Sequence, residues 1–341
     1  MTLARAIVTG DLAELPSRRQ EDWRWSDIRG LLRVLPGPSP TAGAAMPPGP
    51  FADIAAEPVD IINGRGPDRI ELAQGERRVV ALRYFGAEAG SHASQLTVTL
   101  GAGADLLLLE SHEGQDAYVA AADLTITIGA GARLVRLVLA DEPEAAVSVS
   151  NATVNLSAGG RFAQTIATTG ARRQRIETRV EHAGGGAEAR LDGLYRLAGR
   201  SHTDITTVVV HAGPDGTTDQ LTKGVAADQA RGVFQGRIEV ARGSDRTEAR
   251  MGHHALVLSD RAEVDAKPEL EIYADEVVCS HGNSIGALDE EALFYARQRG
   301  LPEDAARALL TEAFLGEVVD RIGHEGARAV MRRFMTPGGL A

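Results

Sequence analysis

The residues best suited to chemistry in this sequence are Cys279 and His281, which lie in the segment VVCSHGNSIG. Two residues apart on an extended strand, a thiol and an imidazole point to the same face. They could share a metal ion, or the imidazole could promote formation of the thiolate. A buried structural cysteine beside a hydrogen-bonded histidine remains an alternative. One cysteine cannot supply the thiolate set of an iron–sulfur cluster, so a cluster would need ligands from a partner.

The other histidines give weaker indications of a site. His253 and His254 are adjacent, so a strand would send them to opposite faces. One of them could join a metal site, but a pair on the protein surface is the favoured interpretation. His202, Asp204 and His211 form a looser group, for which solvated or turn-stabilising roles are favoured. Neither group supports a prediction of catalytic residues.

No nucleotide-binding or common metal-binding motif accompanies these residues. The pattern GxxxxGK[ST] is absent, and neither of the two lysines, Lys223 and Lys267, lies in a phosphate loop. The zinc motifs HExxH and CxxC are also absent. We therefore expect that this chain does not hydrolyse ATP by itself.

The composition predicts a folded, acidic, cytoplasmic protein. The 341 residues carry a formal charge of −11, and 43% of them are hydrophobic, which is enough for a substantial core. The negative charge opposes binding to nucleic acid, and no apolar run reaches the ~18 residues needed to cross a membrane. A single cysteine forms no intramolecular disulfide, and the N-terminal residues lack an apolar stretch of signal-peptide length.

The sequence divides into three segments that differ in composition. Residues 1–35 are predicted to be helical, because apolar residues from Trp23 to Leu35 recur at near-helical spacing and Asp11 is a suitable N-cap. Residues 36–50 contain six prolines and are predicted to be a linker. Beyond them, short runs rich in Val, Ile, Leu and Thr are bounded by Gly and Ala, which is typical of strands.

The turns between these runs repeat at a fixed spacing. GAGA at 101–104 recurs at 129–132, and a related SAGG follows after an equal interval at 157–160. At further intervals of the same length along the sequence, the residues are again small. Such a period holds two strands and two turns, so it predicts a β-solenoid with parallel sheets and glycines at the corners. An antiparallel sandwich remains the alternative.

The C-terminal part is predicted to be helical. Asp289 is a suitable N-cap for a helix that ends at Gly300, and apolar spacing predicts a second helix over 302–322. A shorter helix is predicted around 327–334. These helices could cover an open end of the solenoid, where strand edges would otherwise be unpaired.

The last third of the sequence carries a family resemblance. The segment 268–314, with its CSHG, GALD, LFY and RG steps, resembles the C-terminal signature of the SufB/SufD family of iron–sulfur cluster assembly proteins. GVFQGRIEV at 232–240, LVLS at 256–259 and, more faintly, EDWR at 21–24 add to the resemblance. The chain is more similar to SufD than to SufB, because SufB proteins are typically longer and carry additional cysteines.

The resemblance implies a mainly β protein with a right-handed parallel β-helix core between N-terminal and C-terminal helical regions. The corresponding boundaries are 1–50 for the N-terminal helical region and linker, 51–285 for the core and 286–341 for the C-terminal helices. It also implies a noncatalytic subunit that pairs with a SufB-like paralogue, while its C-terminal helices bind a SufC-like ABC ATPase. A homodimer in isolation is an alternative assembly.

The family also implies roles for particular residues. Cys279 and His281 match the CSHG positions at the SufB–SufD interface, where they are candidate ligands of iron or of a nascent cluster. That cluster would be transient and shared with SufB, a reduced flavin can associate with the complex, and no cofactor would be bound stably by this chain alone. The residues expected to contact the ATPase are Phe294, Tyr295, Leu309, Leu310 and Phe314.

A polysaccharide-acting parallel β-helix enzyme is the alternative from another functional class. Such an enzyme should show a secretion signal, aromatic platforms and clustered carboxylates on one face of the solenoid. Aromatic residues make up only 4% of this chain. The scaffold interpretation is therefore favoured.

Overall fold

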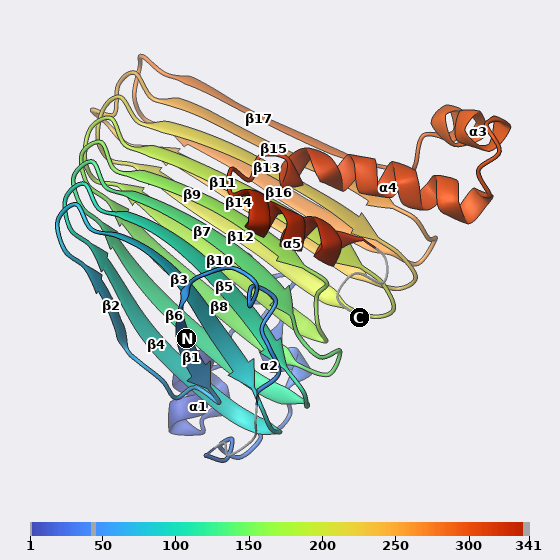
Figure 1. Cartoon of the computed structure of the whole chain (residues 1–341), viewed down its shortest axis with the longest axis horizontal. Helices are drawn as coiled ribbons and strands as arrows, with labels where there is room; N and C mark the ends of the chain where they lie inside the picture. Colours follow the sequence, from blue (N-terminus) through green and yellow to red (C-terminus); the bar gives the residue numbers. More distant parts are fainter. Residues whose placement is uncertain (1, 42–45, 337–341) are drawn as a thin grey trace.

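The computed structural model describes residues 2–41 and 46–336, which form a β-solenoid of parallel strands with short helices near both ends (Figure 1). Nine strands form one sheet in the order β1-β3-β5-β7-β9-β11-β13-β15-β17, and eight form the other in the order β16-β14-β12-β10-β8-β6-β4-β2. Odd and even strands alternate along the chain, so each pair makes one of about eight turns. The predicted parallel solenoid is confirmed and the antiparallel sandwich is excluded.

The nine-stranded sheet contains β1 (Glu57–Ile62), β3 (Arg77–Gly86), β5 (Asp105–Gly114), β7 (Arg133–Asp141), β9 (Arg161–Thr168), β11 (Glu188–Leu197), β13 (Thr217–Ala226), β15 (Glu248–Val257) and β17 (Val278–Gly286). The eight-stranded sheet contains β2 (Arg69–Leu72), β4 (Gly90–Leu100), β6 (Tyr118–Ile128), β8 (Val147–Leu156), β10 (Arg173–His182), β12 (His202–His211), β14 (Arg231–Val240) and β16 (Glu263–Ile272). The helices are α1 (Leu3–Thr9), η1 (Leu12–Glu14), η2 (Glu21–Trp23), α2 (Ile28–Leu31), α3 (Glu290–Gln298), α4 (Glu303–Val319) and α5 (Glu325–Met335).

The fixed repeat of the sequence holds only in the first half of the solenoid. Arg133 pairs with Arg161 at the spacing of the early turns, whereas the pairs of Glu188 with Thr217 and of Thr217 with Glu248 span progressively longer intervals. The extra residues lie in the corners that lead into the nine-stranded sheet, which grow from four residues at 157–160 to seven at 241–247. The strands keep their register because a corner can lengthen without moving them.

The glycines of the early corners have the backbone conformation that the repeat predicts. Gly103, Gly131 and Gly159 have φ angles of 67°, 62° and 64°. A side chain at these angles would be strained. This explains why glycine recurs at the same place in successive turns.

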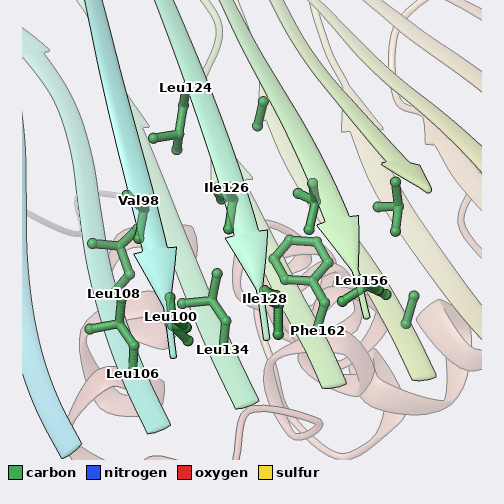
Figure 2. Close-up of a cluster of buried hydrophobic side chains, with 14 of the residues drawn as sticks. Val98, Leu100, Leu106, Leu108, Leu124, Ile126, Ile128, Leu134, Leu156 and Phe162 are labelled. Atoms are coloured by element: carbon green, nitrogen blue, oxygen red, sulfur yellow. The ribbon is translucent and has the colours of Figure 1, made fainter. Parts of the chain in front are cut away.

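Apolar side chains fill the interior between the two sheets. Figure 2 shows Val98, Leu100, Ile126, Ile128 and their neighbours stacked from turn to turn, each contributed by a strand face that points inward. Alternate residues of the same strands point outward, where terminal helices cover them. In Figure 1, α4 and α5 lie across the nine-stranded sheet, and α1 packs on the opposite side against β4 and β6.

The interior also holds a buried ion pair. Arg136 on β7 donates two hydrogen bonds to Glu110 on β5, at 2.6 and 2.8 Å, and a third to Gln164 on β9 at 2.6 Å. Burial alone would raise the pKa of Glu110, but the adjacent guanidinium holds it at about 2. Glu110 is therefore ionised inside the solenoid, and its charge is balanced by Arg136.

The N-terminal region is helical, as predicted, but in short pieces. Residues 2–35 form four of them, since α1 ends at Gly10 with a φ of 72° and Pro16 interrupts the chain before η2. Asp11 does act as a cap, because its carboxylate accepts a hydrogen bond from the Ala13 amide at 2.8 Å. Part of the proline-rich segment is tied to the solenoid through a bridge between Pro38 and Ser91.

The C-terminal helices begin and end close to their predicted positions. The Asp289 carboxylate caps α3 by accepting hydrogen bonds from the amides of Glu291 and Ala292. Across residues 2–41 and 46–336, no helix has the combination of length and apolarity that a membrane crossing requires.

Four buried histidines and the half-buried His92 are held without charge, which predicts sensitivity to acid. Burial lowers the pKa of His182 and His202 to about 3, and that of His92, His211 and His253 to about 4. Below pH 6.5 the unfolded chain binds protons that the folded chain does not, so stability is present above that pH and is lost as pH falls towards 4. Each histidine contributes up to ~1.4 kcal/mol per pH unit.

We therefore expect the melting temperature to fall steeply between pH 6.5 and pH 4.5 in circular dichroism. His182→Gln should reduce the number of protons taken up on unfolding by up to about one. Ser280→Ala is the control, since this exposed side chain carries no titratable group and its removal should leave the slope unchanged. Stability that is constant across this range would contradict the prediction.

Candidate functional site

Cys279 and His281 lie on β17, the last strand of the nine-stranded sheet. β17 pairs with β15 on one side, with Cys279 opposite Ala249 and His281 opposite Met251. Its other edge pairs with no strand of the described chain. Cys279 is half-buried and packs against the interior cluster, whereas His281 is exposed. Because side chains alternate along a strand, both face the open end of the solenoid interior.

The Cys279 thiol is not activated in the isolated chain. Burial raises its pKa, and the opposing hydrogen bond from the backbone of Ala249 does not reverse the shift. The thiol is therefore protonated at neutral pH, which does not support the thiolate that the nearby imidazole could have promoted. A bound metal ion or a positive partner group would be needed to ionise it.

The described residues hold no complete set of metal donors. No group of three or more His, Cys, Asp or Glu side chains within 2–41 and 46–336 is placed to share an ion. Cys279 and His281 therefore provide at most part of a ligand set from this chain, one soft sulfur donor and one imidazole. That donor chemistry fits iron or a nascent iron–sulfur cluster whose other ligands come from elsewhere.

His253 and His254 lie on β15 beside this strand, and they point to opposite faces as predicted. The prediction of a surface pair is wrong for His253, which is fully buried between Tyr195 and Asn283. His254 lies on the outer face and contacts Ser284. Their surroundings differ because β15 is covered on its inner face by the solenoid interior.

The segment 282–286, GNSIG, also matches the GxSxG pattern of hydrolases. The serine of such enzymes sits on a sharp turn between a strand and a helix. Ser284 lies instead within β17, and its hydroxyl group is 2.7 Å from Nδ1 of His254. The strand geometry therefore gives this serine a structural contact with His254, and it lacks the sharp strand-to-helix turn that presents a nucleophile.

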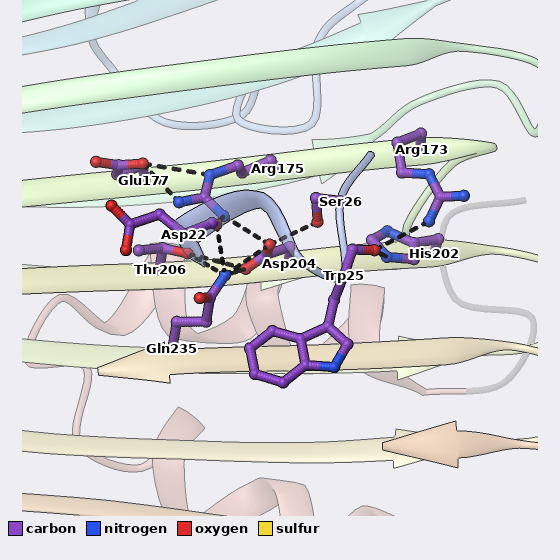
Figure 3. Close-up of polar contacts among 10 residues, drawn as sticks. All are labelled: Asp22, Trp25, Ser26, Arg173, Arg175, Glu177, His202, Asp204, Thr206 and Gln235. Atoms are coloured by element: carbon purple, nitrogen blue, oxygen red, sulfur yellow. Dashed lines mark hydrogen bonds and ion pairs between the residues drawn. The ribbon is translucent and has the colours of Figure 1, made fainter. Parts of the chain in front are cut away.

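Asp204 and the histidines near it are buried, so the predicted solvated roles are wrong. Asp204 accepts hydrogen bonds from Ser26 at 2.5 Å, from Arg175 at 2.7 Å and from Gln235 at 3.0 Å (Figure 3). His202 contacts the backbone carbonyl of Trp25 at 3.1 Å. These contacts fasten the N-terminal segment to the outer face of the eight-stranded sheet, and they belong to the fold.

His211 lies inside the solenoid, away from the Asp204 group. Its ring lies beside that of His182, tilted by 34° with centroids 4.1 Å apart, and its Nε2 is 2.9 Å from the Thr218 hydroxyl. Alternation along β12 separates it from Asp204, because residues an odd number of positions apart point to opposite faces. The three predicted residues therefore do not form one site.

Exposed hydrophobic side chains gather in two places. Among the described residues, ten large hydrophobic side chains are exposed, and four of them surround the free edges of β16 and β17. These four are Ile272, Tyr273, Val278 and Ile285. We call this surface the solenoid end. Four others, Phe294, Tyr295, Leu301 and Leu309, lie on α3, on the first half of α4 or on the connection between them, which together we call the helical hairpin.

The two ends of the solenoid differ in how their edges are protected. At the first turn, β2 has only four residues and β1 carries Pro58 and Glu57, features that discourage pairing with another strand. β17 has nine residues without a proline or a charged side chain among them. A long, uncharged, unpaired edge is suited to pair with a strand of another chain.

A family model of the "SUF system FeS cluster assembly, SufBD core domain" matches residues 84–314. The match covers most of the solenoid together with β17, α3 and part of α4. The chain belongs to the SufBD family. This confirms the resemblance carried by the CSHG segment.

Individual relatives agree with the family match. The chain is 41% identical over 109 residues to the iron–sulfur cluster assembly protein SufD of Escherichia coli. It is 42% identical over 129 residues to a SufBD family protein of Synechocystis, and 32% identical over 162 residues to the chloroplastic protein ABCI7 of Arabidopsis thaliana. The alignments span 32%, 38% and 47% of this chain but only 26%, 28% and 34% of those relatives.

The helical hairpin of this SufBD chain presents three of the five residues predicted to contact a partner. Phe294, Tyr295 and Leu309 are 65%, 60% and 51% exposed, and a hollow of about 500 Å³ lies beside Phe294 where α3 meets α4. Leu310 is half-buried. Phe314 packs within the chain, with the Lys223 ammonium 4.4 Å from its ring centroid.

Two residues that the sequence analysis did not single out contact the site of this SufBD chain. Asn283 lies two residues beyond His281 on β17, and Tyr195 reaches it through His253. Asn283 could have been found, since it continues the alternation of Cys279 and His281. Tyr195 could not, because it is 58 residues away from His253 and only the strand register brings them together.

Proposed function

We propose that this chain is the noncatalytic, SufD-like scaffold subunit of an iron–sulfur cluster assembly complex. In that complex it pairs with a SufB-like paralogue and binds a SufC-like ABC ATPase. The observation that carries the proposal is the unpaired edge of β17, which combines Cys279 and His281 with exposed apolar residues at the solenoid end. Family membership and similarity to SufD support it.

The edge of β17 is suited to strand pairing between chains. Backbone N–H and C=O groups of a free edge can hydrogen-bond to a strand of the partner, while Val278 and Ile285 supply apolar contact at its two ends. Burying these side chains at the interface would remove their apolar surface from water, which would stabilise the complex. A SufB-like solenoid with a similar free edge is the expected partner.

Pairing at this edge would complete the ligand set. Cys279 and His281 supply two donors, and a cysteine of the partner across the interface would supply a third. The nascent cluster is the cargo of this site, held transiently and shared between the two subunits. A reduced flavin that provides electrons would bind to the complex, and this chain by itself would bind no cofactor stably.

The helical hairpin is the proposed contact for the ATPase. It projects from the solenoid in Figure 1, and Phe294, Tyr295 and Leu309 are exposed there. α4 is fastened to the solenoid, because Lys223 on β13 pairs with Glu317 and Arg321 donates to Asp219. ATP hydrolysis in the partner would therefore move the hairpin and the solenoid together, which would open the interface to iron and sulfur.

A matched pair of substitutions tests the proposed interface. Val278 on β17 and Val8 on α1 are exposed valines, 62% and 79% respectively. We expect Val278→Lys to weaken association with the SufB-like subunit at least roughly 30-fold. A lysine at the interface would lose its hydration, and no opposite charge would compensate for that loss. Val8→Lys should change the affinity less than about twofold. Co-purification of the three subunits followed by calorimetry gives both values.

Two results would contradict the proposal. The first is a complex that Val278→Lys binds as tightly as the wild type. The second is the absence of any complex with SufB-like and SufC-like subunits while the chain forms a homodimer through β17. Measuring molecular mass with and without the partners distinguishes the second result.

A further inference from the structure

Among the described residues, the edge strand β17 has a neighbouring strand on only one side. Its position therefore depends on a single row of backbone hydrogen bonds and on side-chain contacts with β15. Two consecutive histidines of β15 make those contacts, one on each face. We propose that His253 and His254 are positioning residues that clamp β17 and thereby fix where Cys279 and His281 stand at the solenoid end. The importance of that placement rests on the proposed function, whereas the clamp itself is a property of this chain.

The inner half of the clamp is a chain of hydrogen bonds that ends on Asn283. Nδ1 of His253 is 2.7 Å from Oδ1 of Asn283, and its Nε2 is 3.0 Å from the Tyr195 hydroxyl. With Nδ1–H donating to the amide oxygen, Nε2 accepts from the Tyr195 O–H group, so one neutral tautomer satisfies both nitrogens. Because both ring nitrogens are occupied, His253 is not available as a metal ligand.

Tyr195, at the buried end of these hydrogen bonds, is held in a fixed place. The ring of Phe234 lies parallel to that of His253 with centroids 4.7 Å apart. Tyr195 fits between Gly224 and Gly232, where an added Cβ would lie 1.7 Å and 2.6 Å from ring atoms of the tyrosine. A larger residue at either glycine would displace Tyr195, so the packing leaves it one position.

The outer half of the clamp joins His254 to Ser284. Nδ1 of His254 is 2.7 Å from the serine hydroxyl oxygen. In the strand register, His253 stands opposite Asn283 and His254 opposite Ser284. The two contacts therefore hold neighbouring residues of β17 from opposite faces of the sheet.

This arrangement specifies the register of β17. A slip of one residue would turn Asn283 to the outer face and break both contacts together. A slip of two would put Gly282 or Gly286 opposite His254, and neither glycine has a hydroxyl group to replace that of Ser284. His281 stands two residues from Asn283 on the same face, so fixing Asn283 fixes the place of His281.

Hydrogen exchange on the isolated chain tests the clamp directly. Asn283→Ala removes the acceptor from an exposed residue and leaves the interior intact, and Ser284→Ala removes the outer contact. We expect each to accelerate amide exchange in 278–286 and alkylation of Cys279 by iodoacetamide by roughly tenfold, and their combination by more. Ser280→Ala, a polar truncation elsewhere on β17, should leave both rates within about twofold of the wild type.

Tyr195→Phe provides a second variant at the buried end, since it removes only the hydroxyl group. We expect it to shift the ¹⁵N signals of the His253 imidazole, which report the tautomer, and to accelerate exchange in β17 less than Asn283→Ala does. Exchange and alkylation rates that match the wild type in both Asn283→Ala and Ser284→Ala would overturn the clamp.

Cluster assembly by the reconstituted complex separates the clamp from the proposed function. If the clamp positions His281, Asn283→Ala should slow assembly by several-fold while the complex still forms. Accelerated exchange without slower assembly would overturn the positioning role. If His281→Ala leaves assembly unchanged, the proposed ligand site fails, while the exchange rates still decide whether the clamp exists.

Discussion

Replacing His281 with alanine is expected to reduce cluster assembly by the reconstituted complex at least about tenfold, because a ligand lost from an incomplete set cannot be replaced by a neighbour. The imidazole is exposed on β17, and no other group of donors lies close to it in the described chain. The same substitution should leave the fold unchanged, since an exposed side chain contributes little to stability. Iron and sulfide content per complex, together with visible absorption, measures the loss.

Ser280→Ala is the matched control for this experiment. Ser280 is adjacent to His281 on the same strand, it is exposed, and alternation directs it to the other face. Cluster yield should therefore remain at the wild-type level in this variant, and both variants should still pair with the SufB-like subunit. Equal cluster yields in His281→Ala and Ser280→Ala would contradict the ligand assignment.

Replacing Arg136 with alanine is expected to lower the free energy of unfolding by about 3–5 kcal/mol. Arg136 and Glu110 are fully buried, so the substitution would leave the Glu110 carboxylate without its compensating charge. The carboxylate would then become protonated, and its pKa would rise from about 2. Urea unfolding followed by circular dichroism gives the change in free energy.

A double substitution separates the loss of charge balance from the loss of packing. Glu110→Gln combined with Arg136→Met removes both charges and keeps most of the side-chain volume, so it should cost less than Arg136→Ala alone. If Arg136→Ala lowers the free energy of unfolding by less than about 1 kcal/mol, the ion pair is not needed for a stable interior.

The solenoid could be predicted from the sequence because it is built from local repetition. Alternating apolar residues specify which face of each strand turns inward, and small residues at 101–104, 129–132 and 157–160 specify where the chain turns. The later change in spacing was not predictable, since corners such as 241–247 gained residues without a distinctive pattern. In the N-terminal region, the sequence predicted helical structure but not its division into short pieces, which contact the eight-stranded sheet.

The arrangement of the candidate site was predictable in part. Residue type and spacing indicate that Cys279 and His281 share one face of a strand, and both lie on β17. Their role as ligands stays a prediction. The burial of His253 and Asp204 was not predictable. Asp204 is bound by Ser26, 178 residues away, and the sequence contains no sign of that contact.

The sequence by itself therefore determined the parallel solenoid, its inward and outward faces, and the pair of donors on one strand, since each depends on neighbours in the chain. Only the tertiary structure decided that, among the described residues, the pair stands on an unpaired edge, that Tyr195 and His253 lie behind it, and that no group of three metal donors forms there. The physical reason is that burial and strand neighbours arise from register between residues on successive turns, far apart in the chain.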